Sequence, residues 1–336
     1  MKILIIGLGS MGKRRVRNLI ALGNFEIYGY DVRKDRLEEA VNLYGIQVTY
    51  NLDDLLKSVK FSSIIISVPP NLHHVYIRKS LEINAPCFVE ASVTNTELKE
   101  LFDISIEKNV LVAPSTTLHF HPAIKLIRDF LEKEYLGKIT NVLYHSGQYL
   151  PDWHTYEKVS EYYVSNPETG GAREIIPFEL TWMLEVLGFP NYVLGVFKKT
   201  INIDGAEKID DTYNALLDYG TFIVNLTVDV VSRYATRTLL INGSEKQLKW
   251  DWNDNFVKIY DSKTNEWKSY YYEVLEAQEG YNKNITEQMY IDELNTFIRA
   301  VRGEVNYPNS LEKDLRILNV LYKIEESYTT KKFTNL

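Results

Sequence analysis

Three glycines near the start of the chain have the spacing that holds a dinucleotide. Gly7, Gly9 and Gly12 form the pattern G-x-G-x-x-G, and Asp31 follows roughly 20 residues later. Gly7 allows a tight turn, Gly9 lets a pyrophosphate approach the backbone, and Gly12 lets a helix pack closely on its strand. Asp31 would accept hydrogen bonds from the adenosine ribose. The chemistry predicted is that of a nicotinamide dinucleotide.

The elements around these glycines are those that such a site needs. An apolar run at 3–6 predicts a buried parallel strand, and an amphipathic helix follows Gly12 and ends at Gly23. A second strand at 25–30 ends beside Asp31. The free N–H groups at the start of the helix can then hold phosphates. The alternative is a glycine turn in an α/β domain that binds no dinucleotide.

Strand and helix patterns continue to alternate up to about residue 120. The clearest strand is SSIIISV at 62–68, which ends at Pro69 and Pro70. Ligands of open α/β folds bind at this carboxyl edge of the sheet. We predict a doubly wound parallel sheet, the Rossmann fold, in a dinucleotide-binding domain over 1–120. The expected cofactor-binding residues are Gly7, Gly9, Ser10, Met11, Gly12, Asp31, Pro69, Asn71, His73 and Glu90.

The second half of the chain predicts a different architecture. Turn residues separate apolar or alternating segments from about 192 to 272, which indicates an antiparallel meander with helices on one face. Residues 121–336 are expected to form an α+β domain for substrate binding and oligomerisation, whose closing helices can pack back on the first domain. The helices are predicted at 122–135, 171–187, 286–301 and 311–328, the second interrupted by Pro177.

Composition excludes several classes of function. The 336 residues carry 38 basic and 45 acidic side chains, a net charge of −7, so neither nucleic acid nor anionic lipid is an expected partner. The single cysteine, Cys87, excludes an internal disulfide. No apolar run reaches the roughly 18 residues of a membrane span. We expect a cytoplasmic protein.

The order and spacing of several short motifs resemble one oxidoreductase family. The strings are GLGSMG at 7–12, SVPPNLHH at 67–74, FVEAS at 88–92, HFHPAI at 119–124, the pair Gly170–Gly171, and DELNTFIRAVRG at 292–303. The chain resembles the glucose-fructose oxidoreductase, inositol dehydrogenase and rhizopine-catabolism (Gfo/Idh/MocA) family over nearly its whole length. That resemblance implies an NAD(P)-dependent oxidoreductase of sugars, sugar phosphates or nucleotide sugars, often a dimer or tetramer.

The resemblance fails at the catalytic positions. Members of the family usually carry Glu-Lys-Pro, where this chain has Glu90, Ala91 and Ser92. Their helix usually presents an aspartate and a histidine where this chain has Ile175 and Phe178. Alcohol oxidation needs a proton acceptor as well as the cofactor, and acid–base catalysis contributes about 10²- to 10⁴-fold. A non-standard acid/base site is therefore expected.

Glu174 and its neighbours offer substitutes. Glu174 lies one turn before Phe178, on the same helix face, and is predicted to be catalytic; the alternative is an ion pair with Arg173 or another helix. Arg173 is predicted to bind a carboxylate or phosphate of the substrate. A structural salt bridge is the alternative. Pro177 cannot donate to the carbonyl of Arg173, which predicts a kink.

The loop that precedes this helix is rich in aromatic residues. Tyr149 and Trp153 could stack on a sugar ring and Asp152 could bind its hydroxyls, so all three are predicted to bind substrate. His154 is the second predicted catalytic residue because histidine titrates near neutral pH. The alternative is a histidine that only binds substrate or contacts a neighbouring subunit. Histidines and carboxylates elsewhere lack a metal-binding spacing, so no metal is expected.

The sequence is compatible with three functions. The leading hypothesis is an NAD-dependent oxidoreductase of a sugar derivative. One alternative is a redox-silent protein that binds NAD for a sensing or structural role, and another is a reductase of a C=N or conjugated bond. NAD is expected over NADP because Asp31 would repel a 2′-phosphate, although Arg33 and Lys34 could attract one. A homodimer or homotetramer is expected because the strand at 222–230 looks apolar on both faces.

Overall fold

The computed structural model describes residues 1–153, 157–273 and 286–336. His154, a predicted catalytic residue, lies outside them. The chain divides into two compact units. Unit 1 comprises residues 1–117 and 288–316, and unit 2 comprises residues 118–287 and 317–336. The division places helix α8 (Glu287–Val301) almost entirely in unit 1 and splits helix α9 (Leu311–Thr330) between the units.

Unit 1 is built on a parallel sheet. In the described residues it has six strands in the order β3-β2-β1-β4-β5-β6. This order reverses between β1 and β4, as in a doubly wound fold. The predicted Rossmann fold is therefore confirmed. The strands are β1 (Lys2–Ile6), β2 (Glu26–Tyr30), β3 (Gln47–Thr49), β4 (Ser63–Ile66), β5 (Cys87–Val89) and β6 (Val112–Pro114).

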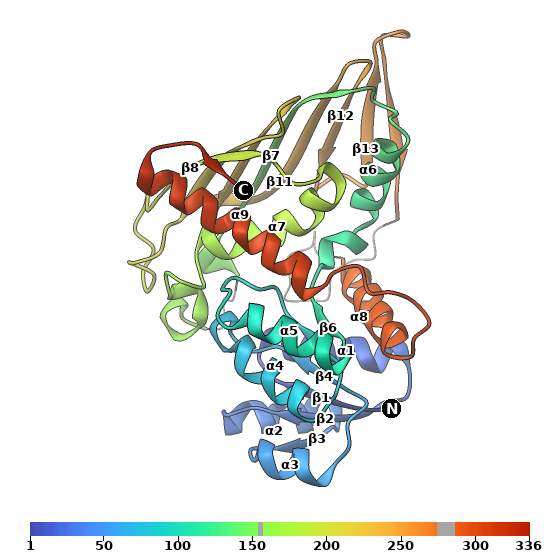
Figure 1. Cartoon of the computed structure of the whole chain (residues 1–336), viewed down its shortest axis with the longest axis vertical. Coiled ribbons are helices and arrows are strands. Elements are labelled where there is room, and N and C mark those ends of the chain that lie inside the picture. The colour runs from blue at the N-terminus through green and yellow to red at the C-terminus, as the bar shows by residue number, and fades with distance from the viewer. Residues whose placement is uncertain (154–156, 274–285) are drawn as a thin grey trace. The chain divides into compact units, whose positions relative to one another are not determined.

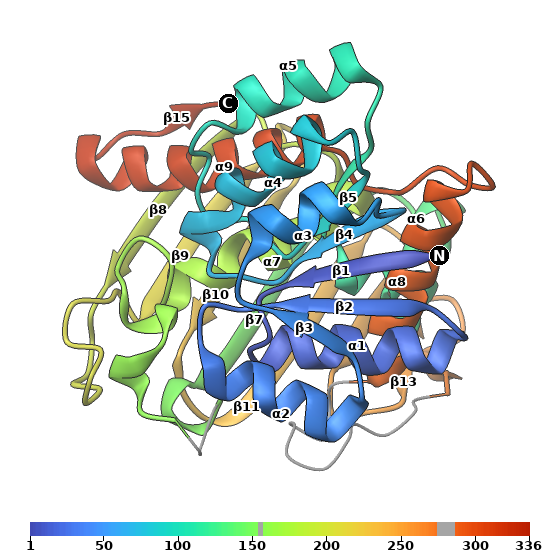
Figure 2. The same cartoon turned by 90° about the horizontal axis from the view of Figure 1, so that it is seen from below.

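Helices cover both faces of this sheet, which explains its unbroken apolar strands. Figure 2 shows α1 (Ser10–Leu22) and α2 (Lys34–Tyr44) on one side and α4 (His73–Glu82) and α5 (Leu98–Lys108) on the other. A short helix, α3 (Leu52–Ser58), begins at Asn51, whose side chain accepts from the N–H of Asp54. Helix α8 contributes Phe297 to the same core as β1 and α1.

Unit 2 contains a larger, mostly antiparallel sheet. In the described residues its order is β14-β13-β12-β11-β7-β10-β9-β8-β15. It is more than the predicted meander, because β7 inserts between β11 and β10 and pairs with β10 in parallel. The strands are β7 (Ile139–Tyr149), β8 (Tyr192–Lys198), β9 (Thr212–Asp218), β10 (Ile223–Asp229), β11 (Val231–Gly243), β12 (Lys246–Asp251), β13 (Phe256–Asp261), β14 (Glu266–Tyr271) and β15 (Thr334–Asn335).

One face of this sheet is covered and the other is open. Figure 1 shows α6 (Pro122–Glu132), α7 (Ala172–Leu187) and α9 on one side of the strands. Val224, Leu226 and Val228 of β10 are buried on that side, as alternation requires. The expectation of a strand that is apolar on both faces was wrong, because the intervening positions include Asn225 and Thr227.

Among the described residues, no helix combines the length and the apolar character needed to cross a membrane.

Candidate active site

The glycine-rich turn connects β1 to α1 in unit 1, and two of its glycines have no room for a side chain. Gly7 has φ of 89°, and a Cβ there would lie 2.4 Å from the carbonyl oxygen of Ser67. A Cβ on Gly12 would lie 1.8 Å from the carbonyl oxygen of Gly7. Helix α1 begins at Ser10 and Met11, directly after Gly9. The turn and the helix start thus have the form that a pyrophosphate needs.

Asp31 lies buried at the end of β2, beside this turn. Its Oδ2 accepts the N–H of Leu8 at 2.7 Å and its Oδ1 accepts the N–H of Arg33 at 2.8 Å. The carboxylate is therefore fixed next to the glycines, at the position that a ribose-binding acid requires.

The basic residues after Asp31 are arranged differently from the sequence expectation. Arg33 pairs with Asp35 at 2.6 Å, and the ammonium of Lys34 lies 3.8 Å from Glu38, all on the surface. Arg36 instead lies over the turn: its Nη1 is 3.8 Å from Oδ2 of Asp31 and 3.3 Å from the place of a Cβ on Gly9. Sequence reasoning missed Arg36, whose position next to Gly9 depends on how α2 packs.

A second loop of unit 1 follows β4 and carries Pro69, Asn71 and His73. Pro70–Leu72 form a short 3₁₀ turn in which Asn71 is exposed, and His73 opens α4. The buried His73 ring donates from Nε2 to the carbonyl of Val68 at 3.0 Å, and burial lowers its pKa to about 4. His73 is thus neutral at physiological pH. Its contact with a cofactor, like those of Pro69 and Asn71, stays a prediction.

Glu90 follows β5 and is held in a buried network. Both of its oxygens accept from Arg15 at 2.8 Å, and Ser67 donates to Oε1 at 3.0 Å. Arg15 also donates to Glu293 of α8 at 3.0 Å. Glu293 accepts further bonds from residues 115–117 after β6. Sequence reasoning missed Arg15 and Glu293, which are 278 positions apart.

These parts of unit 1 fit a nicotinamide dinucleotide. The turn excludes side chains where the pyrophosphate would lie, the start of α1 supplies N–H donors, and Asp31 is fixed beside them. The bound group would supply the hydride acceptor or donor. The individual cofactor contacts remain predictions.

In unit 2, Glu174 occupies the first turn of α7 in an unusual environment. The hydroxyl of Tyr163 donates a short hydrogen bond to its Oε1. Part of the residue is exposed, yet its Oε2 is sealed from solvent and has no hydrogen-bond partner among the described residues. Burial raises the pKa of Glu174 to about 8, although the bond from Tyr163 opposes that shift. A carboxyl group that titrates near neutral pH is suited to acid–base catalysis.

Glu174 lies on the part-exposed face of the first three turns of α7 in unit 2. Among residues 172–184, only Glu174 and Phe178 are part-exposed, and they lie one turn apart. Ile175, at the position of the usual aspartate, is 6% exposed. Helix α7 runs through Pro177 from Ala172 to Leu187.

Arg173 has a structural partner. Its Nε donates to Oε1 of Glu325 at 2.6 Å and its Nη2 to Oε2 at 3.3 Å. Its Nη1 also donates to the backbone carbonyl of Glu168. The central carbon of the guanidinium lies 5.5 Å from the centre of the Tyr322 ring. The structural salt bridge weighed as the alternative is thus present, and binding of a substrate anion by Arg173 stays a prediction.

The aromatic loop of unit 2 is described up to Trp153. Tyr149 ends β7, and the guanidinium of Arg233 lies 3.7 Å from its ring centre. Asp152 is exposed, and Trp153 is part-buried with an Nε1 that has no partner among the described residues. The substrate-binding roles of all three stay predictions.

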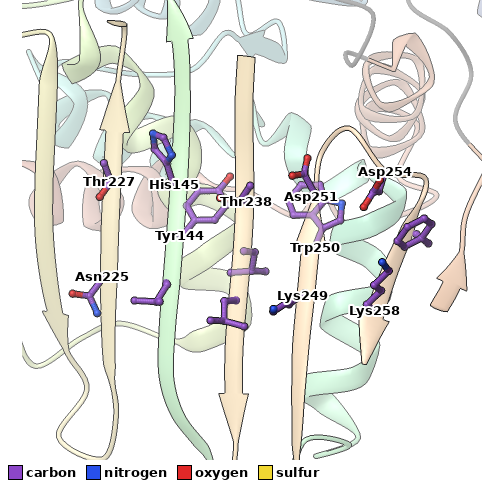
Figure 3. Close-up of a pocket in the computed structure, with 14 residues that line it drawn as sticks. Tyr144, His145, Asn225, Thr227, Thr238, Lys249, Trp250, Asp251, Asp254 and Lys258 are labelled. Carbon is purple, nitrogen blue, oxygen red and sulfur yellow. The ribbon is translucent and has the colours of Figure 1, made fainter. Parts of the chain in front are cut away.

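A separate cavity of about 490 Å³ opens on the uncovered face of the unit 2 sheet. Figure 3 shows His145, Thr227 and Asn225 on neighbouring strands, with Lys249 and Lys258 farther across the sheet. His145 contacts Asp229 at 2.7 Å. No residue predicted for the active site lines this cavity.

The other described histidines of unit 2, His119 and His121, have structural contacts. His119 contacts Glu185 at 2.8 Å, and His121 accepts the N–H of Ala123 at the start of α6. The described residues contain no cluster of three or more histidine, cysteine or acidic side chains that could hold a metal ion.

Comparison with known proteins places this geometry among oxidoreductases. Residues 1–130 match the model of an oxidoreductase family with an NAD-binding Rossmann fold. Two uncharacterized oxidoreductases of Schizosaccharomyces pombe are similar in sequence. One is 24% identical over 63% of this chain and 58% of its own length, and the other is 28% identical over 37% and 35%. The chain thus matches little more than half of the first relative and about a third of the second.

Solved structures share the fold over the full chain. Levoglucosan dehydrogenase in complex with NADH superimposes with a TM-score of 0.84 at 15% identity, over 100% of this chain and 98% of that one. GenD2 from gentamicin A biosynthesis, in complex with NAD, gives 0.80 at 14% identity, over 100% and 96%. At these identities the likeness shows the fold alone.

Proposed function

We propose that this chain, whose residues 1–130 match the model of the Gfo/Idh/MocA family of NAD-binding oxidoreductases, oxidises or reduces a sugar derivative with Glu174 as acid/base. The single observation that carries the proposal is the state of Glu174. Glu174 lies on a part-exposed stripe of α7, and its carboxyl group has a pKa of about 8. The protein lacks the lysine and the histidine that the family usually carries, so another acid/base residue is needed.

The proposed reaction in the oxidative direction is balanced by two transfers. The carboxylate of Glu174 would accept the O–H proton of the substrate carbinol, and a bound nicotinamide would supply the acceptor for its C–H hydride. A carbonyl compound and protonated Glu174 would remain. In the reductive direction Glu174 returns the proton to the carbonyl oxygen, as microscopic reversibility requires. We retain His154 as a second candidate acid/base residue.

A sugar-like substrate is supported by the residues around β7 and its loop. Tyr149 and Trp153 are aromatic and part-exposed, and Asp152 is an exposed hydrogen-bond acceptor, which together suit a ring with an apolar face and hydroxyl groups. One solved structure of the same fold is levoglucosan dehydrogenase with NADH and levoglucosan, at 15% identity. In this proposal Arg173 orients the first turn of α7 through its ion pair, or binds an anionic substrate group.

We further propose that NAD is preferred over NADP and that the working form is a cytoplasmic homodimer or homotetramer. Asp31 would lie next to a 2′-phosphate. Of the basic residues that could offset it, Arg33 and Lys34 are near acidic neighbours on the surface, and Arg36 lies 3.8 Å from Asp31 itself.

A redox-silent protein is the second candidate. Ala91, Ile175 and Phe178 cannot transfer a proton, and the guanidinium of Arg173 is already paired with Glu325. Such a protein would bind NAD and change its stability on binding, but it would not turn over. Reduction of a C=N or conjugated bond is the third, because its proton can come from water.

The experiment that separates these functions is a substrate panel. The protein is incubated with NAD or NADH and with sugars, sugar phosphates, nucleotide sugars and imines, while the absorbance of reduced nicotinamide is followed. Turnover of a sugar class supports the proposal, and turnover of imines alone replaces it with the third function. Tight NADH binding without turnover of any compound supports the redox-silent function.

A further inference from the structure

Tyr163 and Glu174 form a hydrogen-bonded pair within unit 2. The Tyr163 hydroxyl donates to Oε1 of Glu174, and Oε2, which is sealed from solvent, is the oxygen without a hydrogen-bond partner among the described residues. Burial and Tyr163 are the two causes of the shifted pKa of Glu174. Other titratable groups on the segments around the first turn of α7 are Glu161, Tyr162, Glu168, Arg173 and Asp210.

The backbone around Tyr163 fixes this pair. Residues 163–165 form a 3₁₀ turn whose Val164 is completely buried, and the Thr169 hydroxyl donates to the Tyr163 carbonyl at 3.0 Å. The N–H of Gly171 donates to the Val164 carbonyl at 3.2 Å. The turn that carries Tyr163 is thus tied to the residue before α7.

The glycine pair makes this close approach possible. A Cβ on Gly170 would lie 2.0 Å from the carbonyl oxygen of Val164. Gly171 has φ of 65°, and a Cβ there would lie 2.6 Å from the carbonyl oxygen of Asp210. A side chain at Gly170 would therefore push this turn away from α7, and with it the hydroxyl of Tyr163, whereas one at Gly171 would crowd the backbone of Asp210.

We infer that Tyr163 is a positioning residue that holds the Glu174 carboxyl through Oε1 and sets the pH at which its Oε2 accepts a proton. The inference rests on the proposed role of Glu174. Tyr163 donates to the charged form of the carboxyl group, so it favours that form against burial. Without this bond, Glu174 would release its proton only at higher pH, and the carboxyl group would lose one fixed orientation.

The decisive variant is Tyr163→Phe, which removes one oxygen atom and keeps the ring. In the oxidative direction Glu174 must be deprotonated, so kcat/KM of the wild type should rise with pH through about 8, the pKa of Glu174. In Tyr163→Phe this rise should move to higher pH. At neutral pH kcat/KM should fall at least about threefold and recover as the pH rises. Tyr162→Phe, a change on the preceding tyrosine, should keep the wild-type profile.

A readout that needs no turnover is the pH dependence of unfolding. The pKa of Glu174 in the folded state, about 8, exceeds the ordinary glutamate pKa of 4.5, so the folded state binds more protons and stability falls as pH rises between these values. Glu174→Gln should remove this slope, whereas Tyr163→Phe should extend it to higher pH. The double variant should behave like Glu174→Gln, because Tyr163 acts through Glu174.

The outcomes separate the inference from the proposed function. If Glu174→Gln lowers kcat while Tyr163→Phe keeps the wild-type pH profile and unfolding slope, Tyr163 is only a structural residue and the inference is wrong. If Glu174→Gln leaves kcat unchanged, the proposed role of Glu174 fails instead. If the protein has no turnover, the pH dependence of its unfolding still tests the pair. Additive effects of Tyr163→Phe and Glu174→Gln on that dependence in the double variant would overturn the inference.

Discussion

Asp31 and Glu174 are acidic side chains in opposite surroundings. Both oxygens of Asp31 accept backbone N–H groups beside the glycine turn, an arrangement that fixes the group for binding. Glu174 has one hydroxyl donor and one sealed oxygen without a partner. We therefore propose cofactor binding for Asp31 and proton transfer for Glu174.

Cofactor preference tests Asp31. Calorimetry should show tighter binding of NADH than of NADPH by the wild type. Asp31→Asn should raise the Kd for NADH at least about tenfold, because a hydrogen bond to a charged group contributes about 1.5–3 kcal/mol. The preference over NADPH should shrink in the same variant. Asp103→Asn, which alters an exposed acid of α5 that is paired with Lys99, is the control. Equal or tighter binding of NADPH by the wild type would contradict the assignment.

At the residue scale, sequence alone identified groups that belong to a local pattern. The glycines and Asp31 have fixed spacing, and Glu174 was found by its helical offset from Phe178. Tyr163 was not singled out, because its bond to Glu174 depends on a turn that the Gly170–Gly171 pair permits. Arg15 and Glu293 were missed because only the tertiary fold brings them together.

At the element scale, helix α7 is bounded by two glycines with different surroundings. Gly171 precedes it and Gly188 follows it, with φ of 65° and 79°. A Cβ on Gly171 would meet backbone, whereas a Cβ on Gly188 would have no atom within 4 Å. Alanine at Gly188 therefore measures the stability lost through the left-handed backbone conformation alone. Alanine at Gly171 adds the stability lost through a steric clash.

Alanine at these positions should have unequal effects on stability. Gly188→Ala should lower the free energy of unfolding by about 1–2 kcal/mol, the cost of a positive φ. Gly171→Ala should lose roughly a further 1–3 kcal/mol from crowding against the backbone of Asp210. Chemical denaturation measures both. Equal losses would show that Gly171 is needed only for its backbone conformation.

The elements themselves were largely predictable because their apolar periods are clear. The predicted helix at 171–187 and the observed α7 differ by one residue, although Pro177 had suggested a break. The insertion of β7 between β10 and β11 was not predictable, because pairing between distant strands leaves no local pattern. The expectation that the strand at 222–230 is apolar on both faces was wrong, because Asn225 and Thr227 alternate with its buried residues and face outward.

At the scale of the whole molecule, the open face of the unit 2 sheet carries apolar side chains that a second copy could cover. They include Leu143, Val196, Leu216 and Ile223, which are 36–49% exposed and come from strands β7, β8, β9 and β10. Polar residues such as Asn225 and Thr227 lie among them. A mixed surface of this kind is typical of a protein–protein interface.

Light scattering should therefore give the mass of a dimer or tetramer at micromolar concentration. Leu216→Glu should shift the mass towards the monomer, because it places a charge within the interface. Ile106→Glu, which changes an apolar side chain that is 66% exposed on α5 of unit 1, should leave the mass unchanged. A monomeric wild type would count against assembly through this face.

The most direct test of the account is the turnover number of Glu174→Gln. The change keeps the shape of the side chain and removes its basicity, so kcat should fall at least about tenfold while the Kd for NADH stays close to that of the wild type. Glu168→Gln, a change at an exposed acid on the segment before α7, is the matched control and should keep the wild-type kcat. A Glu174→Gln enzyme with unchanged turnover would contradict the claim that proton transfer has moved to this residue.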